Sequence, residues 1–267
     1  MRKLLTIGAL VAGLSFGSCA TMNGQQDLVQ AVDHWSYADN DYGVKDGLIN
    51  EVKPSIEELI IKADYGIGQM KGGCTATTIG SDEDFHYFLT ANHCVEVPEE
   101  LHLPSGMKIN LVSPAEYELD GEKAEVVVKN KVNNGHDYAV LRAKRDDHKF
   151  RNIPFKIGDS DHLQTGDFVY ALGYSLMLDM YLTKGNVSTE RISKGDGYTN
   201  YNGFTFTAQI SQGNSGGPIF AVRDGEIFWV GIVSGQFKGG ADMNIGYRIS
   251  DIRRDIQKHG FKLPFKD

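Results

Sequence analysis

From about residue 55 onward, the chain consists of short runs rich in apolar and β-branched residues, with turn-forming residues between them. The runs are rich in Val, Ile, Tyr, Phe and Thr, and each is bounded by Gly, Asn, Asp or Pro, a pattern typical of β-strands. The clearest runs are CTATTIG, FHYFLTAN, MKINLV, AEVVVKN, DYAVLRA, DFVYALGY, MYLTKGNVS, GFTFTAQIS, GPIFAV, IFWVGIVS and NIGYRI. Such a succession of strands with little helix between them predicts an all-β fold, an antiparallel barrel or sandwich.

The stretch HKFRNIPFK, at residues 148–156, divides these strands into two comparable sets. We therefore predict a first set over about 55–147 and a second over about 155–249. The tail differs, because SDIRRDIQKHG predicts a helix over about 250–259 with Ser250 as N-cap and a stop at Gly260. Its apolar positions near helical spacing are Ile249, Ile252 and Ile256.

The first twenty residues have the features of a secretory signal peptide. A basic start is followed by an apolar stretch over residues 4–16 and small residues near 17–20. The apolar stretch is short for a membrane span, which needs about 20 residues. The segment FGSC at its end resembles the lipobox of bacterial lipoproteins, so lipidation of Cys19 and simple cleavage after Ala20 both remain open. Either outcome predicts an exported protein, in the periplasm, in the cell envelope as a lipoprotein, or secreted.

Residues 21–54 are polar and uneven in pattern, and they are interpreted as a tether, a prosegment or an N-terminal extension. The whole chain carries a net charge of −8, which predicts no nucleic-acid partner because phosphate contacts need clustered Lys and Arg. The acidic stretch 39–51 lacks the Gly and Glu positions of an EF-hand loop in that register. We therefore expect no metal site and no cofactor.

The chain has three cysteines, and two of them flank a predicted hairpin. Cys74 and Cys94 lie twenty positions apart, around two strand-like runs joined by the turn SDED. In an oxidising compartment they could form a disulfide bond, which stabilises by about 3 kcal/mol in the chain-entropy model. Cys19 is left over, at the end of the signal.

The segment GNSGGP surrounds Ser215 with three glycines. A serine hydroxyl is a weak nucleophile, so acyl transfer requires a base, a group that orients the base, and donors for the developing oxyanion. Glycines permit a tight turn that can direct the amides of Gly213 and Ser215 at one point. Two other segments supply the remaining groups: LTANHC places His93 at the end of a strand, and HDYAVLR places Asp137 at the head of another.

These three motifs resemble those of chymotrypsin-like serine peptidases, in the same chain order of His, Asp and Ser. The order matters because other folds carry the same groups in different orders. The resemblance covers roughly residues 55–260 and implies two six-stranded antiparallel barrels with the site between them. It also implies Ser215 as nucleophile, His93 as base, Asp137 as the residue that orients the base, and Gly213 and Ser215 as oxyanion donors.

Asn214 departs from the digestive members of that family, in which an Asp before the serine pairs with a newly released amino terminus. No IVGG-like start stands before Tyr65, so we expect activity without this zymogen switch. In this respect the chain is similar to bacterial high-temperature-requirement peptidases and glutamyl endopeptidases, but we expect no PDZ domain after the terminal helix.

The resemblance also implies that four residues contact the substrate, namely Gln209, Ser234, Gly235 and Gln236. None is a carboxylate, which argues against a strict preference for Lys or Arg. The expected function is therefore an exported serine endopeptidase that acts on polypeptides as a monomer, with a lipid anchor at Cys19 as its one possible membrane contact. The alternatives are a catalytically silent protein-binding module and an esterase on the same fold.

Overall fold

The structure is a computed structural model that describes residues 50–130, 136–154, 156–192, 203–223, 226–237 and 243–265. The chain divides into two units, Met1–Gly43 and Val44–Asp267, and all described residues belong to the second. The predicted signal at 1–20, Cys19, and the extension up to residue 49 lie outside the described residues. No helix in the described ranges is both long enough and apolar enough to cross a membrane.

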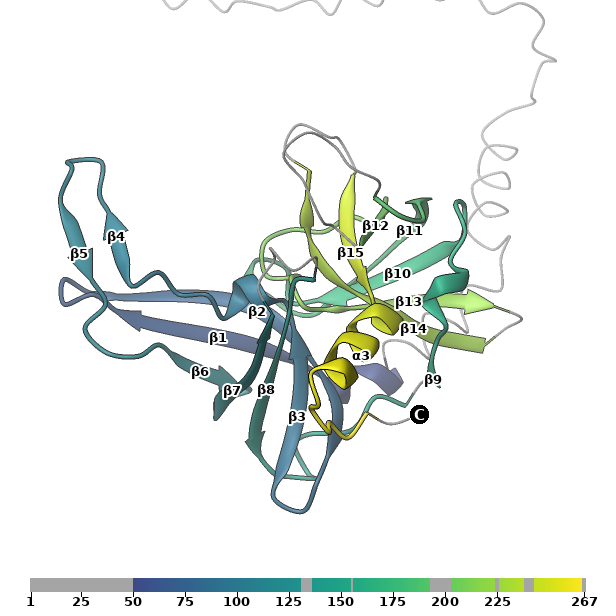
Figure 1. The fold of residues 1–267 in the computed structure, drawn as a ribbon, viewed down its shortest axis with the longest axis horizontal. Coiled ribbons are helices and arrows are strands. Elements are labelled where there is room, and N and C mark those ends of the chain that lie inside the picture. Colours follow the sequence, from purple (N-terminus) through teal and green to yellow (C-terminus); the bar gives the residue numbers. More distant parts are fainter. Residues whose placement is uncertain are drawn as a thin grey trace, which may run out of the picture. The chain divides into compact units, whose positions relative to one another are not determined.

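The first half of the described chain forms a closed six-stranded antiparallel barrel with the order β1-β2-β3-β8-β7-β6 (Figure 1). Its strands are β1 (Ile56–Asp64), β2 (Gln69–Ser81), β3 (Phe85–Thr90), β6 (Glu116–Leu119), β7 (Glu122–Asn130) and β8 (Tyr138–Lys144). A separate hairpin is inserted after β3, formed by β4 (Glu100–His102) and β5 (Lys108–Asn110). Short 3-10 helices precede β1 and follow β3, namely η1 (Lys53–Ser55) and η2 (Asn92–Cys94).

The second half forms another barrel, in which β13-β10-β11-β12-β15-β14 is closed by the pairing of β13 with β14. The strands are β10 (Phe168–Gly173), β11 (Tyr181–Thr189), β12 (Gly203–Phe206), β13 (Pro218–Arg223), β14 (Glu226–Gln236) and β15 (Asn244–Arg248). A short strand, β9 (Lys156–Ile157), adds to β14 in parallel. The 3-10 helices η4 (Ser160–His162) and η5 (Ser175–Met177) and the helix α3 (Ile249–Lys258) complete the described fold. The predicted fold, two six-stranded antiparallel barrels with a terminal helix, is confirmed.

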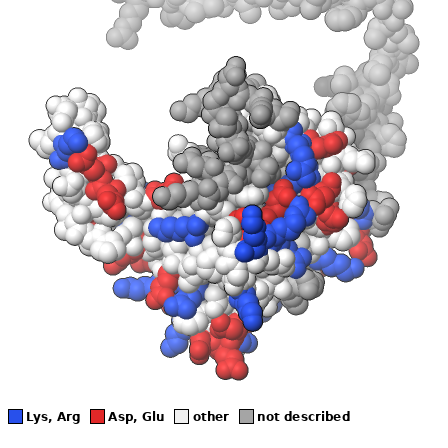
Figure 2. All heavy atoms as spheres, viewed as in Figure 1, with Lys and Arg blue, Asp and Glu red and all other residues white. Residues whose placement is uncertain are grey.

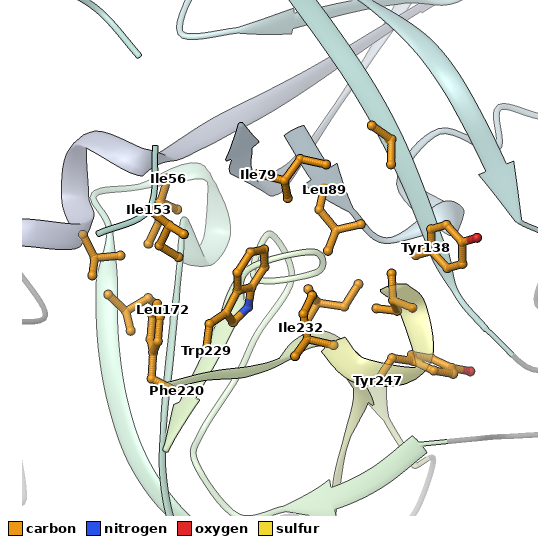
Figure 3. Packing of buried hydrophobic residues seen from close by; sticks show 14 of the residues in the cluster. Ile56, Ile79, Leu89, Tyr138, Ile153, Leu172, Phe220, Trp229, Ile232 and Tyr247 are labelled. Atoms are coloured by element: carbon orange, nitrogen blue, oxygen red, sulfur yellow. The ribbon is translucent and has the colours of Figure 1, made fainter. Parts of the chain in front are cut away.

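The largest hydrophobic cluster joins the two barrels. Figure 3 shows Ile79 and Leu89 of the first barrel packed near Trp229 and Ile232 of the second. The indole of Trp229 is fully buried and donates a hydrogen bond to the Gly231 carbonyl at 2.8 Å. Because burial of large apolar side chains stabilises by about 1.5–3 kcal/mol each, this cluster holds the two barrels together and fixes the surfaces between them.

The structure corrects two sequence predictions at the ends of elements. The predicted helix N-cap, Ser250, is wrong, because α3 begins one residue earlier and its N-cap is Arg248. Ser250 instead exchanges two hydrogen bonds with Ser160, each of 3.1 Å. The predicted strand over 203–211 ends at Phe206, where pairing with β15 stops.

A disulfide bond joins Cys74 of β2 to Cys94 of η2. Replacing both cysteines with alanine should lower the free energy of unfolding by about 3 kcal/mol, because the open chain gains the loop entropy that the bond removes. Urea unfolding of the double variant under non-reducing conditions measures this loss. The wild-type protein after complete reduction should unfold at the same denaturant concentration as the variant; an unchanged midpoint in both would contradict this prediction.

Candidate active site

The pairing of β3 with β8 brings His93 and Asp137 together. Thr90 at the end of β3 lies opposite Ala139 near the start of β8, so the residues just beyond these two positions lie at the same end of the barrel. The His93 imidazole Nδ1 lies 2.7 Å from Asp137 Oδ2, and the His93 amide donates to Asp137 Oδ1 at 2.9 Å. The carboxylate thus fixes both the backbone and the ring of His93.

The electrostatics of this pair favour an ionised carboxylate. Burial tends to raise the pKa of Asp137, but hydrogen bonds from His93 and Ser234, together with the charge of His93, lower it below its usual value. Since an ionised carboxylate only accepts hydrogen bonds, Nδ1 of His93 carries the proton and Nε2 presents a lone pair. Burial lowers the pKa of His93, yet Asp137 and the charge of Glu96 outweigh it and raise this pKa above 6.5.

Ser234 joins this pair from the second barrel. Its hydroxyl donates to Asp137 Oδ2 at 2.6 Å, and its carbonyl accepts a hydrogen bond of 3.1 Å from Ser215 Oγ. The sequence predicted only a substrate contact for Ser234, so its contact with Asp137 was missed. Nothing in the sequence around Ser234 indicates it, since the contact depends on how the barrels dock.

The glycines around Ser215 are required by close backbone approaches. A Cβ on Gly216 would lie 2.3 Å from the Thr75 carbonyl, and one on Gly213 would lie 2.1 Å from the Tyr174 carbonyl. Both glycines also have positive φ angles, of 84° and 98°, which side chains rarely adopt. Glycine therefore lets the segment between β12 and β13, residues 207–217, lie between β2 and η5. We call this segment the serine loop.

In the described part of the chain, two backbone amides of this loop have no hydrogen-bond partner. Among the described residues, neither the Gly213 amide nor the Ser215 amide donates a hydrogen bond to any backbone or side-chain acceptor. Both residues line a pocket of about 420 Å³ that His93 also lines. The same pocket is thus lined by the His93 imidazole, by Ser215, which carries the hydroxyl, and by Gly213. Gly213 and Ser215 are the two residues that carry these amides.

Ser215 Oγ makes no hydrogen bond to His93 in the described structure, because it donates to Ser234 instead. The predicted site residues His93 and Asp137 are in direct contact, and Ser215 lies at the same pocket. A rotation about the Ser215 Cα–Cβ bond redirects its hydroxyl without any backbone movement.

A second, largely apolar pocket of about 310 Å³ lies on the disulfide side of His93. Its walls come from β1, β2, the segment after η2, and β4, and its apolar lining includes Ile61, Tyr65, Val97 and Leu101. Both pockets share β2 residues 71–74 and His93.

The other predicted substrate residues lie on the second barrel. Gln209 is exposed and lines a shallow pocket with Thr183 and Lys184. The Gln236 side chain donates to the Ile210 carbonyl at 3.2 Å, so it bridges the end of β14 and the segment that follows β12. Gly235 beside it has open space where a side chain would begin.

The site does not offer thiolate ligands for a metal. Cys74, His93 and Cys94 bring their potential ligand atoms within 4.8 Å of one another. Metal binding by cysteine needs the thiolate, whereas both sulfurs here are in a disulfide bond.

Away from this site the surface charges are mixed, and Figure 2 shows acidic and basic side chains interspersed on one face. An example is Asp161, which pairs with Arg254 and Arg191.

Comparison with known proteins identifies relatives in bacteria. The chain is 32% identical over 168 residues to a probable periplasmic serine endoprotease, DegP-like, of Marinomonas sp. (strain MWYL1), covering 61% of this chain and 30% of that protein. It is 34% identical over 187 residues to the serine protease Do-like HtrA of Bacillus subtilis (strain 168), covering 68% of this chain and 34% of that protein. The chain therefore spans about a third of the length of these relatives.

Among solved structures, the active form of the Rv3671c protease from M. tuberculosis has a similar fold. The TM-score is 0.58 at 20% sequence identity, and the likeness covers 85% of this chain and 90% of that one. The family model described as "Trypsin-like peptidase domain" matches residues 74–232, which is more than half of the chain. The chain belongs to the trypsin-like peptidase family.

Proposed function

We propose that the protein is an exported serine endopeptidase that cleaves polypeptides through an acyl-enzyme, with His93, Asp137 and Ser215 as its catalytic triad. The observation that carries this proposal is the pocket that His93, Gly213 and Ser215 line together. His93 is hydrogen-bonded to Asp137, and the Gly213 amide has no hydrogen-bond partner among the described residues. Family membership and the names of the relatives support the same reaction class.

In the first step, the Ser215 hydroxyl turns from the Ser234 carbonyl toward His93 Nε2 and attacks the carbonyl carbon of the scissile peptide bond. His93 accepts the hydroxyl proton as the Oγ–C bond forms, and the carbonyl π electrons move to the oxygen. The Gly213 and Ser215 amides then donate to this oxyanion. Removing one donor of this type lowers kcat by about 10²- to 10³-fold.

In the second step, His93 returns its proton to the amine as the C–N bond breaks, leaving an ester on Ser215. A water molecule then loses a proton to His93 and attacks the ester carbonyl carbon. His93 returns this proton to Ser215 Oγ as the ester C–O bond breaks, which releases the acid and restores Ser215. During both steps the imidazolium is stabilised by the Asp137 carboxylate, and Ser234 holds that carboxylate in place through its 2.6 Å hydrogen bond.

We propose that the substrate binds as an extended strand along Ser234, Gly235 and Gln236 at the end of β14. Backbone hydrogen bonds of this kind are independent of side chains. Gln209 and Gln236 are uncharged, so they offer no paired anion for a buried Lys or Arg of the substrate.

Export is part of this proposal. The signal-like residues 1–20 support it, and several relatives are named as periplasmic enzymes. We propose that the mature chain is either cleaved after Ala20 or lipidated at Cys19, and mass spectrometry of the mature amino terminus distinguishes these two outcomes.

A fluorophosphonate probe tests the proposed function, because it phosphonylates only an activated serine. We expect one label per chain, located on Ser215 by peptide mass spectrometry, together with cleavage of casein. A catalytically silent binding module would stay unlabelled. An esterase would be labelled but would cleave a p-nitrophenyl ester and leave casein intact. Labelling of a different serine would overturn the assignment of Ser215.

The pH dependence of activity should follow the protonation of the His93 imidazole. Because Asp137 raises the pKa of His93 above 6.5 and only the neutral imidazole accepts a proton, kcat/KM should fall as the pH decreases through a value above 6.5. The measurement is kcat/KM from pH 5 to pH 9, with His102→Gln as a matched control that should leave the profile unchanged. An acid limb centred well below 6.5 would contradict this prediction.

A further inference from the structure

Three consecutive residues at the start of η5, the N-cap Tyr174 and the first two helical residues, hold three consecutive residues of the serine loop. The Leu176 amide donates to the Gln212 carbonyl at 2.5 Å. The Ser175 hydroxyl donates to the Asn214 side-chain oxygen. The Tyr174 amide donates to Thr75 Oγ1 at 3.0 Å, and that hydroxyl donates in turn to the Gly213 carbonyl at 2.7 Å. We call residues 174–176 the loop clamp.

The clamp sets the direction of the Gly213 amide. In a trans peptide unit the carbonyl and the N–H point in opposite directions, and the chain contains no cis peptide bond among its described residues. Because Leu176 holds the Gln212 carbonyl on the η5 side, the N–H of Gly213 in the same unit points away from η5. Reversal of this unit would break the Leu176 hydrogen bond and turn the Gly213 amide toward η5.

The next two peptide units are held as well. The carbonyl of Gly213 is fixed by the Thr75 hydroxyl, and the carbonyl of Asn214 accepts a hydrogen bond of 2.9 Å from the Gly217 amide. The second of these bonds fixes the Ser215 amide by the same geometric rule. Both oxyanion donors thus depend on contacts outside the catalytic triad.

The backbone at the end of the clamp adopts a conformation that has a cost. Leu176, the last clamp residue, and Met177, which follows it, have φ angles of 55° and 57°, and the left-handed region costs about 1–2 kcal/mol for each residue with a side chain. Such strain persists only where surrounding contacts hold it, and it is concentrated at functional sites. The clamp is therefore maintained by its contacts with the serine loop.

Asn214 connects the clamp to the loop interior. Its side chain is fully buried, and its amide nitrogen has no hydrogen-bond partner among the described residues. The Ser175 hydroxyl is thus the hydrogen-bond partner of the Asn214 side-chain oxygen inside the loop. An unpaired buried polar group costs about 1–3 kcal/mol, so losing Ser175 would leave both ends of the amide unsatisfied and favour rearrangement of the loop.

We propose that Ser175 is a positioning residue for the oxyanion hole. Through Asn214 it holds the serine loop in the conformation in which the Gly213 and Ser215 amides face the substrate, in place of an ion pair with a newly released amino terminus. This inference rests on the proposed peptidase function.

The test compares Ser175→Ala with Ser175→Thr, which keeps the hydroxyl, and with Ser105→Ala, an exposed serine on the β4–β5 turn. For hydrolysis of p-nitrophenyl acetate we expect Ser175→Ala to lower kcat by about 10- to 100-fold, because outright loss of one oxyanion donor costs about 10²–10³. KM should change by less than about threefold. Ser175→Thr should recover kcat to within about threefold of wild type, and Ser105→Ala should match wild type.

A second comparison tests the route through Asn214. If Ser175 acts through this side chain, the double variant Ser175→Ala/Asn214→Ala should lose no more kcat than Asn214→Ala alone, since residues in one network are not additive. If the kcat losses of the two single variants multiply in the double variant, Ser175 does not act through Asn214. Melting temperatures of all variants separate positioning from folding.

Each outcome is decisive. Wild-type kcat in Ser175→Ala, or a loss that tracks the melting temperature and is not recovered by Ser175→Thr, would overturn the inference. Failure of the proposed function looks different: a catalytically silent wild-type protein would neither hydrolyse the ester nor take up the fluorophosphonate label, and an esterase would hydrolyse the ester but leave casein intact.

Discussion

Replacing Ser215 with alanine should lower kcat for casein-derived peptides by about six orders of magnitude. Among the described residues that line the pocket shared with His93 and Gly213, Ser215 is the only one with a hydroxyl side chain. Its neighbours Gly213 and Gly216 occupy positions where a Cβ would meet backbone atoms, so neither position can carry a nucleophilic side chain in its place. Without it, only substrate binding and the oxyanion donors can accelerate hydrolysis.

The measurement is steady-state peptide cleavage with purified wild-type and variant protein. Ser211→Ala is the matched control, because Ser211 is an exposed serine on the same loop, and it should retain wild-type turnover. The variant should keep its melting temperature, since Ser215 Oγ makes one hydrogen bond, to the Ser234 carbonyl. A Ser215→Ala protein that cleaves peptides at even a tenth of the wild-type rate would contradict the assignment.

Replacing Asp137 with asparagine should lower kcat by about four orders of magnitude. The buried carboxylate accepts hydrogen bonds from the His93 ring, the His93 amide and Ser234. An asparagine in the same place would donate its amide N–H to Nδ1, which moves the imidazole proton to Nε2. The base would then present a proton where it needs a lone pair, although the geometry of the site stays the same.

The pH profile distinguishes this explanation from simple misfolding. Loss of the carboxylate removes the interaction that raises the pKa of His93, so the remaining activity should have its acid limb at lower pH than wild type. Asp179→Asn, an exposed acid after η5, serves as control and should leave both rate and profile unchanged. A wild-type rate for Asp137→Asn would remove Asp137 from the mechanism.

Much of the fold could be predicted from local pattern, because its strands either alternate apolar and polar residues or consist of a short apolar run. The strand β1 was missed because its first residues include Glu57 and Glu58, whereas its inward positions Leu59, Ile61 and Ala63 do alternate. The end of β12 was also missed. Beyond Phe206 the alternation continues in sequence, but the chain leaves β15 and crosses close to Gly185, where a Cβ would lie 2.0 Å from the Ala208 amide nitrogen.

The site was predictable only in part, for a physical reason. His93, Asp137 and Ser215 each stand in a recognisable motif, and motifs are local. Ser234 and Ser175 make hydrogen bonds to residues 97 and 39 positions away, and no local pattern indicates such contacts. They depend on the docking of the barrels and on the path of the η5 turn.

The most direct test of the central claim, that His93 and Ser215 act as one unit, is to measure kcat for Ser215→Ala, His93→Ala and the double variant on one peptide substrate. All three should fall to the same residual rate, about 10⁶-fold below wild type, because either loss alone already disables the unit. A double variant well below both single variants, or either single variant near the wild-type rate, would contradict it.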